Sequence, residues 1–117
     1  MDVVKMSFTN NPGNLIVCRR MISGLSSNMG YSIDEIEELL FVTTAALILL
    51  AFTNSIDIKI EMSKPLNFEF EAVGSNRAVK TDNALEMLNI RYYEKIVREF
   101  KIVRKEDNTI KGVSFCM

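Results

Sequence analysis

The chain has 117 residues, of which 48% are hydrophobic, so we expect one domain of ordinary core size over residues 1–117 and no second domain. Fourteen basic against fifteen acidic residues leave a formal charge of −1, which provides no field for non-specific nucleic-acid binding. With no histidine and only two cysteines, the chain cannot form a histidine-based triad or the usual zinc sites, and we expect free thiols in a reducing cytoplasm.

The N-terminal quarter of the chain predicts a strand followed by a helix. Apolar and polar residues alternate over residues 4–8, which is typical of a half-buried strand. Asn11 and Pro12 then suit the N-cap and the first position of a helix, and apolar residues recur three and four apart over residues 12–29. An early acid and the lack of a long apolar stretch at the N-terminus indicate no signal peptide.

A second helix is predicted to begin at Ser32, where Ser32 and Glu35 have the spacing of a capping box. Residues 45–52 are apolar on every side of this helix, so we expect its later turns to be covered all round. The apolar run over residues 39–52 is shorter than the roughly 20 residues that a membrane span needs. It therefore indicates a buried helix and no membrane segment.

The middle of the chain predicts a β-hairpin. Apolar residues alternate with polar ones over residues 56–62 and again over residues 66–72, and residues 63–65 supply a turn between them. We expect such a hairpin to have one solvent-exposed face and one buried face.

The remaining residues predict one more helix and two strands. Thr81 or Asp82 could cap the helix, whose buried side we expect to contain Leu85, Leu88, Tyr92 and Ile96. The strands are predicted around residues 100–102 and 113–117, with Gly112 as a bulge. The order β-α-α-β-β-α-β-β predicts an α+β fold, a two-layer sandwich in which about three helices cover a mixed, mainly antiparallel sheet.

This order and several local strings resemble the anti-sigma regulatory factor or serine-protein kinase branch of the histidine-kinase-like ATPase (GHKL) superfamily. Asn14-Leu15 followed by Arg19 is similar to the first-helix signature of that branch, and residues 31–36 are similar to the polar start of its second helix. The resemblance covers nearly the whole chain. It implies a bacterial, cytoplasmic protein that would use ATP and magnesium if its nucleotide site were intact.

The residues that the family uses for this chemistry are missing here. The resemblance places Ala45 at the position of the catalytic glutamate and Leu49 at that of the magnesium-binding asparagine, and hydrocarbon can neither accept a proton nor ligate a hard cation. Ala72 replaces the adenine-binding aspartate, although Gly74 of the same pattern remains. Residues 75–88 lack the glycines of a phosphate-binding lid.

We therefore expect a pseudo-ATPase or pseudokinase with a degenerate nucleotide site at Ala45, Leu49, Ala72 and Gly74, and with no metal or cofactor. The resemblance implies regulation of transcription by binding a sigma factor or an anti-anti-sigma factor, as a homodimer and without nucleic acid. Arg19 and Arg20 would then belong to the partner-binding face. Two arginines on the outer stripe of a helix are, however, more often simply solvated.

Two other functions stay open at this point. The first is an active ATP-dependent serine-protein kinase whose ligands come from elsewhere, such as Asn76, Asp82 or Asn83. The second is a dimerisation or small-molecule sensor module that has reused the emptied pocket.

The two cysteines have different expected surroundings. Cys18 lies on the apolar stripe of the first predicted helix, where a free cysteine behaves as a small hydrophobe. Cys116 lies near the end of the sequence and would be reactive only if it were exposed, because the chain contains no histidine to activate it.

Overall fold

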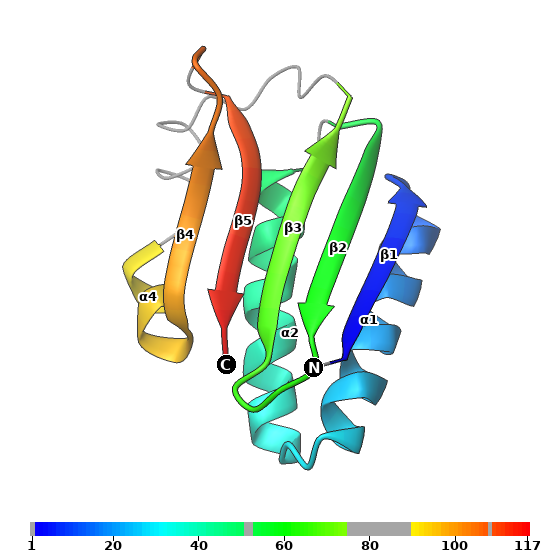
Figure 1. The fold of residues 1–117 in the computed structure, drawn as a ribbon, viewed down its shortest axis with the longest axis vertical. Coiled ribbons are helices and arrows are strands. Elements are labelled where there is room, and N and C mark those ends of the chain that lie inside the picture. Colours follow the sequence, from blue (N-terminus) through cyan, green and yellow to red (C-terminus); the bar gives the residue numbers. More distant parts are fainter. Residues whose placement is uncertain (1, 51–52, 75–89, 108) are drawn as a thin grey trace.

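The computed structural model describes residues 2–50, 53–74, 90–107 and 109–117. Its elements follow the predicted order β-α-α-β-β-α-β-β (Figure 1). They are β1 (Val3–Thr9), α1 (Pro12–Asn28), α2 (Ile33–Leu49), β2 (Ser55–Glu61), β3 (Asn67–Val73), α4 (Ile90–Ile96), β4 (Arg98–Arg104) and β5 (Ile110–Cys116).

The strands form one open sheet of five strands in the order β1-β2-β3-β5-β4. All neighbouring strands are antiparallel, so the prediction of a mixed sheet is wrong for the described strands. The reason lies in the connection from β1 to β2. Helices α1 and α2 run down and back up behind the sheet, so the chain returns to the end at which β1 finished and β2 runs in the opposite direction (Figure 1).

The helices and the sheet form two layers. Helices α1 and α2 lie behind one face of the sheet in Figure 1, and α4 lies beside α2. There the ring of Phe41 in α2 is 5.7 Å from that of Tyr92 and 5.4 Å from that of Tyr93 in α4. The fold is therefore an α+β sandwich. No helix within the described residues has the length and apolar character needed to cross a membrane.

Both predicted helix starts are confirmed. The Asn11 side chain accepts a hydrogen bond of 2.9 Å from the N–H of Asn14, and Pro12 occupies the first turn of α1. At the start of α2 the Glu35 N–H donates to the Ser32 hydroxyl at 3.2 Å, and the Ser32 N–H donates to the Glu35 carboxylate at 2.9 Å. The hydrogen bond from the Ser32 backbone N–H, followed by one from the Ser32 side chain, lowers the pKa of the Glu35 carboxyl group.

The alternation predicted for the hairpin is also confirmed. In β2 and β3 the residues on the helix side of the sheet are buried, and their neighbours on the other side are half-buried or exposed. The buried residues are Ile56, Ile58, Ile60, Phe68, Phe70 and Ala72. Strand β1 keeps the predicted parity, but its inward residues are only half-buried because it is an edge strand.

Two predictions about helix faces are wrong. Tyr92 is 50% exposed, whereas its neighbour Tyr93 is 8% exposed and faces the core. Tyr93 is buried because it packs between Phe41 of α2 and Phe100 of β4. The later turns of α2 are not covered all round either, because Ile48 is 44% exposed beside a hollow that separates it from α1. Leu85 and Leu88 lie outside the described residues.

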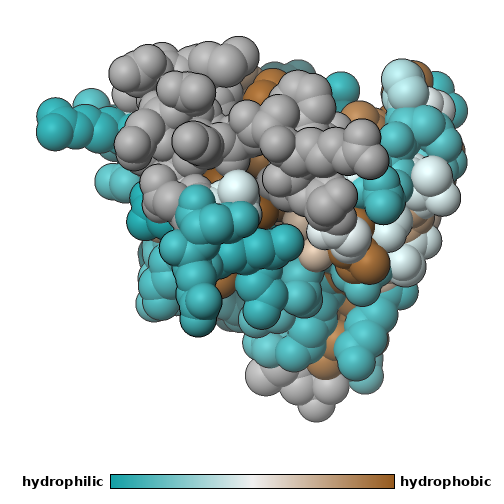
Figure 2. All heavy atoms as spheres, turned by 90° about the horizontal axis from the view of Figure 1, so that it is seen from above, coloured by the Kyte–Doolittle hydropathy of each residue, from teal (hydrophilic) through white to brown (hydrophobic). Residues whose placement is uncertain are grey.

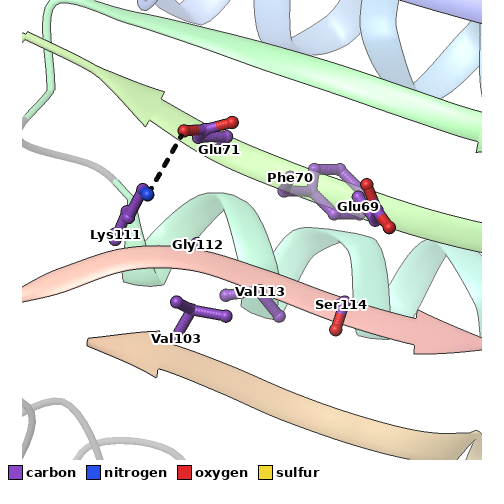
Figure 3. A pocket seen from close by; sticks show the side chains of 8 residues that line it. All are labelled: Glu69, Phe70, Glu71, Val103, Lys111, Gly112, Val113 and Ser114. Atoms are coloured by element: carbon purple, nitrogen blue, oxygen red, sulfur yellow. Dashed lines mark ion pairs between the residues drawn. The ribbon is translucent and has the colours of Figure 1, made fainter. Parts of the chain in front are cut away.

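Gly112 lies beside an irregularity in the sheet, as predicted. Val103 pairs with Gly112 and Arg104 pairs with Ile110, so Lys111 is an extra residue in β5. A Cβ atom on Gly112 would lie 2.6 Å from the backbone carbonyl oxygen of Phe70 in β3. Only glycine lets the two strands approach this closely, and Figure 3 shows Gly112 among the residues that line a hollow on this face of the sheet.

Candidate functional site

Three of the four positions of the degenerate nucleotide site lie in the hydrophobic core. Ala45 is 1% exposed and Leu49 is fully buried, both on α2, and Ala72 of β3 is 9% exposed. All three belong to one contiguous core cluster, so the structure brings them into the same apolar interior. The fourth position, Gly74, is exposed just after the end of β3.

Gly74 has a local structural role. Its φ is 89°, a conformation that L side chains rarely adopt, and a Cβ atom there would lie 2.8 Å from the Nδ2 atom of Asn54. Because a tight turn against Asn54 already requires glycine, the presence of Gly74 does not by itself indicate an adenine pocket.

Ala45 and Leu49 themselves carry no polar side-chain group, and the described polar side chains buried in the same part of the molecule include Thr43 and Thr53. The core cluster around them is hydrocarbon, apart from the Cys18 thiol and the Tyr31 and Tyr93 hydroxyls. No group of three or more histidine, cysteine, aspartate or glutamate residues that could hold a metal ion occurs within residues 2–50, 53–74, 90–107 and 109–117. Asn76, Asp82 and Asn83, the ligands that an active kinase would recruit, lie outside the described residues together with the lid segment over residues 75–88.

Arg19 and Arg20 are exposed on α1, and Arg19 lines a hollow of about 450 Å³ between α1 and α2. Ile16 on α1 and Ile48 on α2, which are 53% and 44% exposed, are apolar residues in its wall. Figure 2 looks onto this end of the molecule and shows hydrophobic atoms at the surface among hydrophilic ones. The full lining is Asn10, Asn11, Pro12, Leu15, Ile16, Arg19, Thr44, Leu47 and Ile48. We call this the α1–α2 groove.

Two asparagines fix the position of the α1–α2 groove. Asn11 caps the start of α1, and the side-chain amide of Asn10 donates to the backbone carbonyl oxygens of Leu50 and Thr53, both at 3.3 Å. The start of α1 is thereby tied to the end of α2, where unpaired carbonyl groups need donors. A polar corner thus closes one end of an otherwise apolar groove.

The electrostatics of the α1–α2 groove favour a negatively charged ligand. Arg19 and Arg20 are the only charged residues between Pro12 and Asn28, and among the described residues no carboxylate forms a salt bridge with either. The four acids of α2, Asp34, Glu35, Glu37 and Glu38, lie in its first two turns, whereas the groove is lined by residues of its later turns. Apolar walls and one unpaired arginine can bind an apolar segment with a carboxylate.

Neither cysteine has the surroundings of a reactive thiol. Cys18 is 2% exposed, as its place on the apolar stripe predicts, and burial raises the pKa of its thiol from 9.0 to about 11. Cys116 is 6% exposed, and burial, followed by the negative charge of Glu99, raises its pKa as well. Both thiols therefore stay protonated at neutral pH, and no thiolate nucleophile is available.

The open face of the sheet is a weaker candidate. The hollow above Gly112 measures about 240 Å³ and is lined by side chains of β3, β4 and β5 (Figure 3). Lys111 and Glu71 face each other across it at 4.0 Å, and both side chains are more than half exposed. A solvated pair of this kind is typical of the wet face of a sheet.

Comparison with protein-family models and with curated sequences finds no significant match. The fold and the α1–α2 groove are therefore the main guides to function. Sequence reasoning selected Arg19 but missed Ile48, because an exposed residue within an apolar run has the same pattern as a buried one. The available signal was Ile16, an apolar residue on the same outer surface of α1 as Arg19 and Arg20.

Proposed function

We propose that this protein is a non-catalytic regulator of the GHKL superfamily, similar to anti-sigma factors, that acts in the bacterial cytoplasm by binding another protein. Its partner would be a sigma factor or an anti-anti-sigma factor, and its expected assembly is a homodimer. The α1–α2 groove, with Arg19 and Arg20 beside it, is the surface to which we assign partner binding.

The burial of Ala45 and Leu49 supports the absence of catalysis. These side chains contribute to the core in the place where the family resemblance puts a proton acceptor and a magnesium ligand. A carboxylate and an amide would be costly there without polar partners, and hydrocarbon removes that cost. The two-layer α+β fold is shared by many unrelated proteins, so it does not by itself support membership of the family.

The observation that carries the proposal is the exposure of Ile16 and Ile48 on opposite walls of a groove that also contains Arg19. Exposed apolar residues around a concave surface are typical of a binding site. Arginine is enriched among residues that dominate binding energy, because it combines a charge with a planar surface. An apolar segment of a partner with a carboxylate near its centre would satisfy all three residues.

The partner test uses the tagged full chain expressed in its native cell. We expect a sigma subunit or an anti-anti-sigma protein to co-purify and to be identified by mass spectrometry. With the purified partner, Arg19→Glu or Ile16→Asp should weaken binding at least tenfold, because each removes a groove contact worth about 1.4 kcal/mol or more. Lys101→Glu, which changes an exposed charge on β4, is the matched control and should leave the affinity unchanged.

Two outcomes would contradict the assignment. Recovery of no transcription-related protein under conditions that preserve the fold would remove the anti-sigma function. Undiminished binding by both groove variants would place the interaction on another surface.

Titration with ATP and magnesium separates this function from an active kinase. We expect no change in thermal stability, because Ala45 and Leu49 provide no ligand for either. A kinase with ligands supplied by Asn76, Asp82 or Asn83 would be stabilised by about 2.7 kcal/mol at a nucleotide concentration one hundred times its dissociation constant. A saturable, magnesium-dependent shift would therefore favour the kinase.

A further inference from the structure

A second hollow, of about 260 Å³, lies between β1 and α1 and shares no residue with the α1–α2 groove. Three of the residues that line it contain sulfur, namely Met6 from β1 and Cys18 and Met21 from α1. The rest of its lining is Ser7, Phe8, Asn14 and Val17. Sulfur-containing residues therefore come to this hollow from both of its walls.

The fold explains why these three residues lie on facing surfaces. In β1 the even-numbered residues are the half-buried ones, so Met6 is on the helix side of the sheet, where it packs against the core. Cys18 and Met21 are three residues apart in α1, so they share the face of the helix that is turned towards β1. Cys18 is 2% exposed and Met21 is 44% exposed. The three residues thus extend from the core to the surface.

The Cys18 thiol is buried without a polar interaction. It is a free thiol, and burial is the only cause of its raised pKa, to which no hydrogen bond or charge among the described residues contributes. Beside it, the Met21 side chain is apolar and yet nearly half exposed. A ligand that enters at Met21 would therefore break no existing hydrogen bond or ion pair of either sulfur.

We propose that Met6, Cys18 and Met21 form a binding site for monovalent copper. Thiolates and thioethers are soft ligands that select Cu(I), whereas zinc sites use imidazole, thiolate and carboxylate groups and magnesium requires oxygen. The chain contains no histidine, and no carboxylate lines this hollow among the described residues. The ligand set of two thioethers and one thiol therefore fits Cu(I) and not the commoner divalent ions.

The charges of such a site balance. A thiol that coordinates a metal ion is deprotonated, so the copper ion replaces the thiol proton of Cys18, which passes to the solvent. One thiolate and two neutral thioethers around a monovalent cation give a complex with no net charge. A neutral complex avoids the cost of burying an unpaired charge beside Phe8 and Val17, whereas a divalent ion would leave a positive charge there.

The first test is a titration of the full chain with Cu(I), under reducing, oxygen-free conditions and in competition with a chromophoric Cu(I) chelator. We expect the protein to take one equivalent of copper from the chelator. X-ray absorption at the copper edge should then show sulfur neighbours only, and an excess of Zn(II) should not displace the copper.

Variants separate coordination from packing. Cys18→Ala removes the only anionic ligand and should weaken Cu(I) binding at least hundredfold, and Met21→Leu keeps the apolar volume and should weaken it at least tenfold. The matched controls are Cys116→Ala and Met29→Leu, which change a buried thiol and a partly buried methionine outside the hollow. Both controls should leave the affinity unchanged, with circular dichroism confirming the fold of every variant.

Three results would overturn the proposal. They are a folded native chain that takes no Cu(I) from the chelator, folded Cys18→Ala and Met21→Leu variants that bind it as tightly as the native chain, and binding that only Cys116→Ala abolishes. If Cys18→Ala does not fold, Met21→Leu and Met6→Leu decide in the same way. Because the hollow and the α1–α2 groove share no residue, failure of copper binding would leave the proposed function standing.

Discussion

Ala45→Glu is expected to lower the free energy of unfolding by about 4 kcal/mol or more, because it places a carboxyl group in the hydrophobic core. Ala45 is 1% exposed and its surroundings are apolar. Even the hydroxyl of Thr43, two residues earlier, is buried without a hydrogen-bond partner among the described residues. A buried carboxyl group must either ionise without a partner or stay protonated with a strongly raised pKa.

The same variant should have a characteristic dependence on pH. In the unfolded chain the new carboxyl group loses its proton near its ordinary pKa of about 4.3, whereas in the folded protein its pKa is raised. Above about pH 4.3 the folded state therefore binds more protons than the unfolded state, and the stability of the variant falls as the pH rises. Urea denaturation at pH 5 and pH 8 should therefore show the larger loss at pH 8. Ile48→Glu, at a position that is 44% exposed on the same helix, is the control and should cost less than about 1 kcal/mol.

Native-like stability of Ala45→Glu would mean that the interior beside α2 opens to water. In that case a nucleotide pocket could exist at this place, and the argument for a pseudo-ATPase from Ala45 and Leu49 would fail.

Features that depend on neighbours in the sequence could be predicted. The buried and exposed faces of β2 and β3 follow from the strict alternation of apolar and polar residues, and the burial of Phe68 and Phe70 agrees with it. A shift of the strand register by one residue would move every core residue to the exposed face. The capping box of Ser32 and Glu35 is likewise complete within one helical turn. These interactions do not require knowledge of the rest of the fold.

Features that depend on distant residues could not be predicted. Tyr92 and Tyr93 differ by only about 100° around the helix axis, and contact with Phe41, far earlier in the chain, determines which of them is buried. The hydroxyl of Tyr31 donates to the carbonyl oxygen of Met117 and accepts from the N–H of Leu66 at 3.1 Å. No local pattern connects three such separate segments.

The candidate site also contains residues that could be predicted from the sequence and a groove that could not. Ala45, Leu49 and Arg19 could be selected because the family resemblance is a pattern along the sequence. The groove beside Arg19 depends on how far α1 lies from α2, which is set by Asn10 and by the side chains between the two helices. Its existence therefore emerges only from the folded structure.

Phe115→Ala is expected to cost about 3–5 kcal/mol, because Phe115 is the centre of the aromatic part of the core. Its ring lies 5.1 Å from that of Phe68, 5.8 Å from that of Phe70 and 6.2 Å from that of Phe100. The side chain is 3% exposed, so truncation would leave a cavity between strands β3, β4 and β5. Chemical denaturation followed by circular dichroism measures the loss.

Phe115→Leu separates lost volume from lost aromatic contact. Leucine keeps most of the apolar volume, so its cost should stay below about 1.5 kcal/mol if filling the space is what matters most. A loss for Phe115→Leu close to that for Phe115→Ala would mean that the ring contacts with Phe68 and Phe70 dominate. A loss below 1 kcal/mol for the alanine variant would contradict the arrangement itself, because a ring in contact with three others cannot be removed from a close-packed core at so small a cost.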